Sequence, residues 1–177
     1  GGGGGADKGW GGRRADGVGG ATAGDLAARD GLALIAGAGN EPTGTAGIYV
    51  EARGRNTIVI GPGANAALST AFLEQQQALL AGAKVVLVQL ESPVQTIEAA
   101  LAAAREAGVT TVLNAAPADA PSSIGLLKLA DVLTPNETEF ASLLGRHVGE
   151  RVDADDVAAL DGASLHALCR KLVGNGT

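Results

Sequence analysis

The sequence of 177 residues has few aromatic side chains, no methionine, one cysteine and no long apolar run. Aromatic residues make up 2% of the chain, so the stacking side chains of many nucleic-acid-binding domains are nearly absent. The formal charge of −6 provides no basic field for nucleic acid or for anionic lipid. Apolar runs fall short of the ~20 residues that a membrane-spanning helix needs. We therefore expect neither a nucleic-acid partner nor a membrane partner.

The single cysteine, Cys169, excludes a disulfide framework within the chain and fits a reducing compartment. The first residues show no basic and then apolar signal, so a cytoplasmic location is expected. Apolar residues make up 46% of the chain and are mostly Ala, Val and Leu, which suits helices packed on a buried sheet. The composition thus predicts an α/β fold.

The sequence divides into three segments of different character. Residues 1–40 are rich in glycine without a period, which predicts a flexible or degenerate segment. Residues 41–66 contain two β-rich runs, TGTAGIYV and TIVI, and then the loop GPGAN, which predicts a hairpin. Residues 67–177 predict a partial α/β domain. Because methionine is absent and the last residues follow a helical pattern, we expect a fragment or a truncated gene product, incomplete at both ends.

Strands and helices alternate in the third segment. Strands are expected at KVVLVQLE (84–91), VTTVLNAAP (109–117) and DVLTP (131–135), and the uniformly apolar first strand should be buried on both faces. Helices are expected at about 69–81, 93–107, 122–130, 136–144 and 163–173. This order indicates right-handed crossovers and a parallel sheet. Ligands bind outside the carboxyl ends of such strands, where residues 89–91, 114–117 and 134–139 lie.

Asn136 has two readings that are compatible. As a helix N-cap, it would accept a hydrogen bond from the third helical residue, and Glu139 would return one in a capping box. The same helix end has free N–H groups and partial positive charge, which suit phosphate. A carboxylate there could also hold Mg²⁺ through water.

Polar residues at the other strand ends leave a similar choice open. Glu91 ends a hydrophobic strand, and it is either a solvated strand end or an acceptor for the hydroxyls of a polyol. Asn114 poses the same choice. The glycine-rich GAGN (37–40) and TAGD (22–25, with Asp25) follow no credible strand and lack the lysine and hydroxyl of a GxxxxGK[ST] loop. His147 and His166 lack metal-ligand spacing, and Cys169 on an apolar helix face is interpreted as core.

Five motifs together resemble a known family. PTGTAGIYV, PGANAAL, QLESP, LNAAPA and LTPNETE, in this order from about residue 41 to 173, resemble the ribokinases of the phosphofructokinase-B (PfkB) family of carbohydrate kinases. The resemblance implies a three-layer α/β sandwich with a small β-sheet lid that often pairs with another subunit, hence a possible homodimer through the lid strands. It also implies transfer of the ATP γ-phosphoryl to the primary hydroxyl of ribose, with Mg²⁺ and, in a full-length version, a monovalent cation such as K⁺.

The resemblance assigns roles by position. Ala64 and Asn65 lie in the segment near the sugar, and Glu91 matches a sugar-contacting glutamate. Asn136 and Glu139 match an N-x-x-E motif near the ATP phosphates and Mg²⁺, so we expect Asn136 to contact the nucleotide and Glu139 to serve the metal.

The sequence also departs from the family pattern. A GGKGANQA-like sugar segment is not recognisable in the opening residues, and the GAGD-type loop with the catalytic aspartate would lie beyond Thr177. We therefore expect no catalytic residue within this chain and no activity from the chain alone. A non-catalytic remnant and another PfkB sugar or nucleoside kinase fragment remain alternatives. A dinucleotide-binding oxidoreductase is disfavoured because no G-x-G-x-x-G joins a first strand to a first helix.

Overall fold

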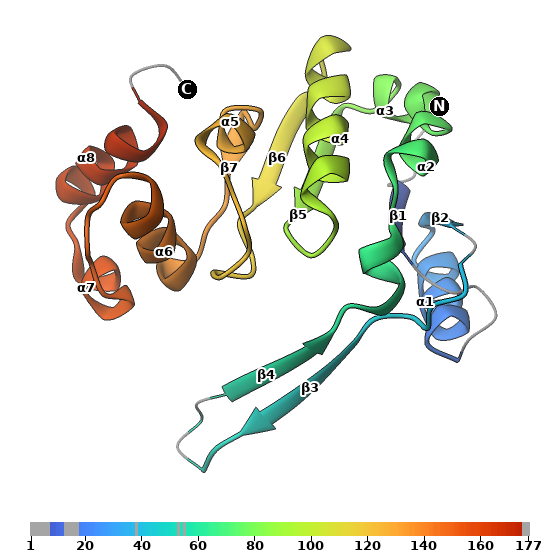
Figure 1. Ribbon diagram of the computed structural model, residues 1–177, viewed down its shortest axis with the longest axis horizontal. Coiled ribbons are helices and arrows are strands. Elements are labelled where there is room, and N and C mark those ends of the chain that lie inside the picture. The colour runs from blue at the N-terminus through green and yellow to red at the C-terminus, as the bar shows by residue number, and fades with distance from the viewer. Residues whose placement is uncertain (1–7, 13–17, 38, 53, 55, 175–177) are drawn as a thin grey trace. The chain divides into compact units, whose positions relative to one another are not determined.

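The computed structural model describes residues 8–12, 18–37, 39–52, 54 and 56–174. The chain divides into two compact units, residues 1–72 and 73–177, with separate sheets (Figure 1). The elements that begin in the first unit are β1 (Lys8–Gly12), α1 (Val18–Arg29), β2 (Ala33–Gly37), β3 (Thr45–Val50), β4 (Asn56–Gly61), the 3-10 helix η1 (Gly63–Ala67) and α2 (Thr70–Glu74). Those of the second unit are α3 (Gln77–Ala81), β5 (Val85–Gln89), α4 (Val94–Glu106), β6 (Thr110–Asn114), α5 (Ile124–Leu127), β7 (Val132–Leu133), α6 (Glu137–His147), α7 (Ala154–Ala159) and α8 (Gly162–Val173).

The glycine-rich opening, predicted as a flexible or degenerate segment, contains regular structure among its described residues. Strands β1 and β2 pair in parallel, from Lys8 opposite Ala33 to Gly12 opposite Gly37, and α1 lies between them in sequence. Main-chain groups alone form such a ladder, so glycines at four positions of the pair do not prevent it. GAGN therefore does follow a strand, and Asp25 lies inside α1. Residues 1–7, 13–17 and 38 lie outside the described residues.

The predicted hairpin is present in the first unit. Strands β3 and β4 are antiparallel, from Thr45 opposite Gly61 to Val50 opposite Asn56 (Figure 1). Its apolar side chains are exposed on both faces, including Ile48 at 60%, Tyr49 at 67% and Val59 at 59%. A two-stranded hairpin is marginally stable alone in water, so these faces are suited to contact with another surface.

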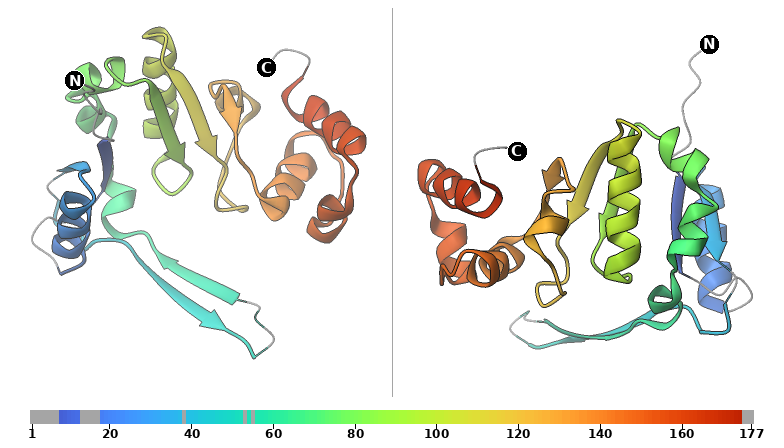
Figure 2. Two further views of the ribbon diagram at one scale, coloured as in Figure 1. Left: turned by 180° about the vertical axis from the view of Figure 1, so that it is seen from behind. Right: turned by 45° about the horizontal axis from the view of Figure 1, so that its top comes forward.

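The second unit contains the predicted parallel sheet. The strand order is β5–β6–β7, with Val85 opposite Thr110, Gln89 opposite Asn114 and Leu113 opposite Leu133. Helix α4 packs against β5 and β6 (Figure 2). Its buried face includes Ile97, Leu101 and Ala104 at helical spacing, and Ile97 and Leu101 join the core around Leu113.

Several local predictions differ from the structure. Val85 and Leu87 are 54% and 66% exposed, so β5 is not buried on both faces. The helix expected at 69–81 is divided into α2 and α3, and α4 has Pro93 as its N-cap without a side-chain hydrogen bond. Helix α6 continues past Gly145 to His147, and α7 was not predicted. Among the helices that the structure describes, none combines the length and apolar character that a bilayer crossing requires.

A polar network joins β6 to β7 at the amino ends of these strands. Thr111, which is fully buried, donates from its hydroxyl towards Leu129 O at 2.8 Å and Asp131 Oδ2 at 2.9 Å. Its N–H also donates to Asp131 Oδ2 at 2.8 Å, and Arg105 on α4 donates to Asp131 Oδ1 at 2.7 Å. The bonds from Thr111, and then the charge of Arg105, lower the pKa of Asp131 below 3.8.

We expect acid to destabilise the second unit through Asp131. Because the folded-state pKa lies below the unfolded value, the stabilisation is complete above the unfolded pKa and is lost as pH falls through the folded pKa. Asp131→Asn should therefore flatten the dependence of the melting temperature on pH below about pH 5. Circular dichroism melts between about pH 2 and 7 would measure this. Asp119→Asn, at an exposed loop residue, is the control, and parallel pH curves for Asp131→Asn and wild type would contradict the expectation.

Candidate functional site

Three segments of the second unit follow neighbouring parallel strands, as predicted. Gln89 and Asn114 end β5 and β6 in register, and Thr134 N donates to Leu113 O at 3.0 Å just after β7. Residues 89–91, 114–117 and 134–139 therefore share the carboxyl edge of the sheet. This edge is where ligands bind in open parallel sheets, so it is the candidate site of this unit.

The predicted capping box is closed at the start of α6. Asn136 Oδ1 accepts from Glu139 N at 2.9 Å, and Glu139 Oε2 accepts from Asn136 N at 2.9 Å. Asn136 Nδ2 also donates to Glu139 Oε1 at 2.9 Å. Asn136 is exposed, whereas Glu139 is only 7% exposed. The buried carboxylate is thus fixed by one residue, and each of its oxygens retains capacity for one further hydrogen bond.

Glu91 lies exposed at the end of the first strand of the sheet. Its Oε1 accepts from Gln89 Nε2 at 3.0 Å, which aligns the carboxylate along the strand end. The remaining acceptor positions of a carboxylate are enough for two sugar hydroxyls. The geometry of Glu91 is compatible both with a solvated strand end and with an acceptor for the hydroxyls of a polyol.

Asn114 is half-buried and shapes the next strand end. Its Oδ1 accepts from Ala116 N at 3.0 Å, and Ala116 O accepts from Leu90 N at 3.0 Å. These bonds tie the loop after β6 to the end of β5. Asn114 therefore acts on the backbone of the candidate site, a role that the sequence did not reveal.

Ala64 and Asn65, the other predicted sugar-side residues, lie in η1 of the first unit. Ala64 is 5% exposed, and its N–H donates to Pro42 O at 2.8 Å. Asn65 N donates to Pro62 O at 3.0 Å, which closes the tight turn. Thr43 beside this turn has a buried hydroxyl oxygen that lacks a hydrogen-bond partner within the described part of the chain. The two ends of the hairpin are therefore packed closely together at its base.

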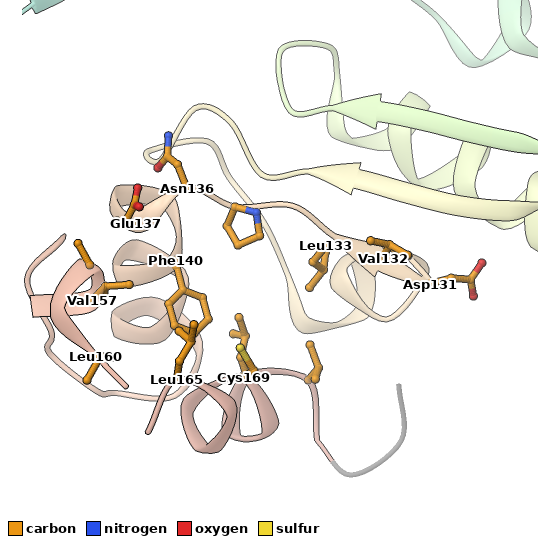
Figure 3. A pocket seen from close by; sticks show the side chains of 15 residues that line it. Asp131, Val132, Leu133, Asn136, Glu137, Phe140, Val157, Leu160, Leu165 and Cys169 are labelled. Carbon is orange, nitrogen blue, oxygen red and sulfur yellow. The ribbon is translucent and has the colours of Figure 1, made fainter. Parts of the chain in front are cut away.

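A cavity of about 620 Å³ lies between β7, α6, α7 and α8 (Figure 3). Its wall is largely apolar and includes Phe140, Leu165 and Cys169, with Asn136 and Glu137 on its lining. The interpretation of Cys169 as a packing residue agrees with this position. Glu139 does not line the cavity, so the cavity and the carboxylate of the capping box are separate features. An apolar wall does not suit phosphate groups.

The remaining polar residues in the described part of the chain form no metal cluster. No group of three or more His, Cys, Asp or Glu side chains suited to a metal ion occurs within residues 8–12, 18–37, 39–52, 54 and 56–174. His147 instead forms a hydrogen bond between its Nε2 and Ser122 Oγ at 2.9 Å. Burial lowers the pKa of His147, and the positive charge of Arg146 lowers it further. His147 is thus bound to a loop.

The sequence is similar to a known protein family and to curated proteins. Residues 34–172 match the pfkB family carbohydrate kinases. The chain is 42% identical over 125 residues to a ribokinase of Haemophilus influenzae, which covers 71% of this chain and 39% of that protein. It is 35% identical over 128 residues to a ribokinase of Schizosaccharomyces pombe, covering 72% of this chain and 38% of that protein. The chain therefore spans about two fifths of the length of these curated relatives.

Solved structures show the same likeness. Ribokinase from Giardia lamblia superposes with a TM-score of 0.73 at 25% identity, over 93% of this chain and 48% of that one. Arabidopsis thaliana ribokinase, solved in complex with ribose and ATP, gives a TM-score of 0.63 at 27% identity, over 92% of this chain and 51% of that one. The expected fold, a parallel sheet flanked by helices in a ribokinase-like arrangement, is confirmed. With its family match, its relatives and its fold in agreement, the chain belongs to the pfkB family of carbohydrate kinases.

Proposed function

We propose that this chain is part of a ribokinase-type sugar kinase, which transfers the γ-phosphoryl of ATP to the primary hydroxyl of ribose. The observation that carries the proposal is the Asn136–Glu139 capping box at the carboxyl edge of a parallel sheet, within the residues that match the pfkB family carbohydrate kinases. In such a kinase the reaction depends mainly on positioning and on charge stabilisation. We divide the residues of this chain into those that would bind the nucleotide (the nucleotide edge) and those that would bind the sugar (the sugar edge). A cytoplasmic location fits this role.

The nucleotide edge is the first turn of α6. The free N–H groups of this turn can donate to a phosphate, and the exposed Asn136 is placed to contact it. Mg²⁺, which ATP-dependent transfer requires, would neutralise phosphate charge there. The donor set fits the ion through water, since Glu139 offers a single carboxylate whose two oxygens already accept from Asn136.

Glu91 forms the sugar edge of the second unit, and the family resemblance separately assigns Ala64 and Asn65 of the first unit to the sugar. An uncharged polyol is recognised by hydrogen bonds, and Glu91 is an exposed carboxylate acceptor on a rigid strand end. Ala64 and Asn65 lie at the base of the hairpin, where they can face a sugar covered by β3 and β4. The exposed apolar faces of this hairpin also favour contact with the lid of a second copy.

Replacing Glu91 with alanine should weaken ribose binding by about ten- to a hundredfold, the value of one charge-assisted hydrogen bond. Isothermal titration with ribose measures this loss, and titration with a non-hydrolysable ATP analogue should give an unchanged affinity. Glu98→Ala, at a half-buried residue of α4, is a control on the same unit. Unchanged ribose affinity for Glu91→Ala would make Glu91 a solvated strand end only.

The same titrations separate the alternatives. Binding of a nucleoside in place of ribose would favour another kinase of the family. A chain that binds neither sugar nor nucleotide would support the non-catalytic remnant and contradict the proposed function.

A further inference from the structure

The loop of residues 115–123, which joins β6 to α5, is held by the last two turns of α6. Ser142 Oγ donates to Ala118 O at 2.6 Å, and Arg146 Nη2 donates to the same oxygen at 3.3 Å. Arg146 Nη1 donates to Ala120 O and, at 3.2 Å, to Ser122 Oγ. Two side chains of one helix therefore bind three acceptors of the loop.

The spacing of the donors on α6 matches that of the acceptors in the loop. Ser142 and Arg146 are four residues apart, so they lie on one face of α6. The planar guanidinium presents several donors in a fixed fork, which lets Arg146 reach acceptors on alternate residues of the loop. A lysine would bring its donors from a single nitrogen and could not span the same acceptors as well.

His147 completes the contact from the next position of α6. Because Arg146 donates to Ser122 Oγ, the hydroxyl hydrogen of Ser122 remains available for His147 Nε2 at 2.9 Å. With Ser122 as the donor, His147 is a neutral imidazole with its hydrogen on Nδ1. Burial and the charge of Arg146 lower the pKa of His147, which favours the same neutral form.

The beginning of the loop belongs to the candidate site. Ala116 N donates to Asn114 Oδ1, and Ala116 O accepts from Leu90 N, both at 3.0 Å. Ala120 N then donates to Pro117 O at 2.9 Å, directly before the residues held by Arg146. The same loop thus contacts the carboxyl edge at one end and α6 at the other, and α6 also carries the capping box at its first turn.

We propose that Arg146 is a positioning residue of the candidate site. By holding residues 118–122 on α6, it keeps the backbone around Asn114 and Ala116 in one arrangement at the carboxyl edge. That this edge is a kinase site rests on the proposed function. That Arg146 holds the loop in place does not.

Amide hydrogen exchange measured by NMR on the whole chain tests the inference without any ligand. Arg146→Met should speed exchange of the Ala116 and Ala120 amides by about tenfold, because their hydrogen-bonded loop opens locally. Arg146→Lys should give an intermediate increase. Arg151→Met is the matched control, since Arg151 is exposed and forms no bond recorded within the described ranges. Amides inside β6 should keep their wild-type rates in all three variants.

A second readout comes from the imidazole of His147. Its ¹⁵N shifts should show hydrogen on Nδ1 in the wild type, and its pKa should rise in Arg146→Met because a neighbouring positive charge is removed. An equal acceleration of all slow amides in the second unit would overturn the inference, because Arg146 would then only stabilise the unit. Unchanged rates at Ala116 and Ala120 would overturn it as well.

Titrations with ribose and a non-hydrolysable ATP analogue separate this inference from the proposed function. Weaker binding of either ligand by Arg146→Met, with wild-type exchange in β6, supports the positioning role. If the wild-type chain binds neither ligand, the proposed function fails, and the exchange rates alone still decide whether Arg146 holds the loop.

Discussion

Replacing Gly63 with alanine should disrupt the base of the β3–β4 hairpin and lower the free energy of unfolding of the first unit by about 3 kcal/mol. Gly63 has a φ of +49°, a conformation that costs L side chains energy. A Cβ there would also overlap Pro42 O and lie 3.0 Å from Gly44 N and 3.1 Å from Thr43 C. All three are main-chain atoms, so no side chain can rotate away. Pro42 O is further fixed by the bond from Ala64 N.

Gly54 offers a matched control in the turn of the same hairpin. Its φ is +82°, but a Cβ there would meet nothing within 4 Å. Gly54→Ala should therefore cost only the conformational strain, about 1–2 kcal/mol. Guanidinium titrations followed by the fluorescence of Trp10, the one tryptophan in the sequence, would compare the variants. Equal losses for Gly63→Ala and Gly54→Ala would show that the close contact at Pro42 is not important.

The same glycine bears on function, because Ala64 and Asn65 follow it directly. A shifted turn would move both predicted sugar-side residues together with the hairpin. Gly44 shows the reciprocal contact, since a Cβ there would lie 2.8 Å from Pro62 O and 3.3 Å from Asn65 Nδ2. The two ends of the hairpin can thus approach because each carries a glycine. The sequence predicted a loop at GPGAN but not the close main-chain approach that Gly63 permits there.

Local patterns predicted the features that depend on neighbouring residues. The spacing of Asn136 and Glu139 predicted their capping box, because its bonds join residues three apart. The alternation of apolar strands and helices predicted the parallel order of β5, β6 and β7. In the glycine-rich opening the apolar pattern was too sparse to show β1, although main-chain pairing with β2 needs no side chains.

Contacts between distant residues could not be predicted in this way. Arg146 and Ala120 are 26 positions apart, and no periodicity connects a basic residue at a helix end to a loop carbonyl. The basic side chain had an ordinary explanation, since cations favour helix C-termini. The exposure of Val85 and Leu87 was missed for a related reason, because an apolar run does not reveal whether both faces of a strand are covered.

Replacing Glu139 with glutamine should separate its capping role from a role towards Mg²⁺. Glutamine keeps one acceptor for Asn136 N but turns its amide group towards Asn136 Nδ2, so one hydrogen bond is lost. The expected cost is about 1 kcal/mol of unfolding free energy. Glu139→Ala removes both bonds and should cost about 2 kcal/mol, at the upper end for helix caps. Thermal melts of the two variants would give these values.

The effect of Glu139→Gln on nucleotide binding should exceed its effect on stability. If the carboxylate holds the hydration shell of Mg²⁺, losing its charge removes a charge-assisted contact, which weakens binding of an ATP analogue by about ten- to a hundredfold. The loss should appear only with Mg²⁺ present, because without the ion the carboxylate would repel the phosphates. Calorimetric titrations with and without Mg²⁺ would measure it.

Glu137 supplies the matched control for this prediction. It lies in the same first turn of α6 and is exposed, so it shares the helix end but not the buried bonds to Asn136. Glu137→Gln changes the net charge by the same amount and should alter Mg²⁺-dependent affinity by less than about threefold, as expected for a solvated charge. If both variants lose affinity equally, the effect is general electrostatics at the helix end. If neither does, Glu139 acts only as a cap, and the nucleotide edge depends on Asn136 and the main-chain N–H groups.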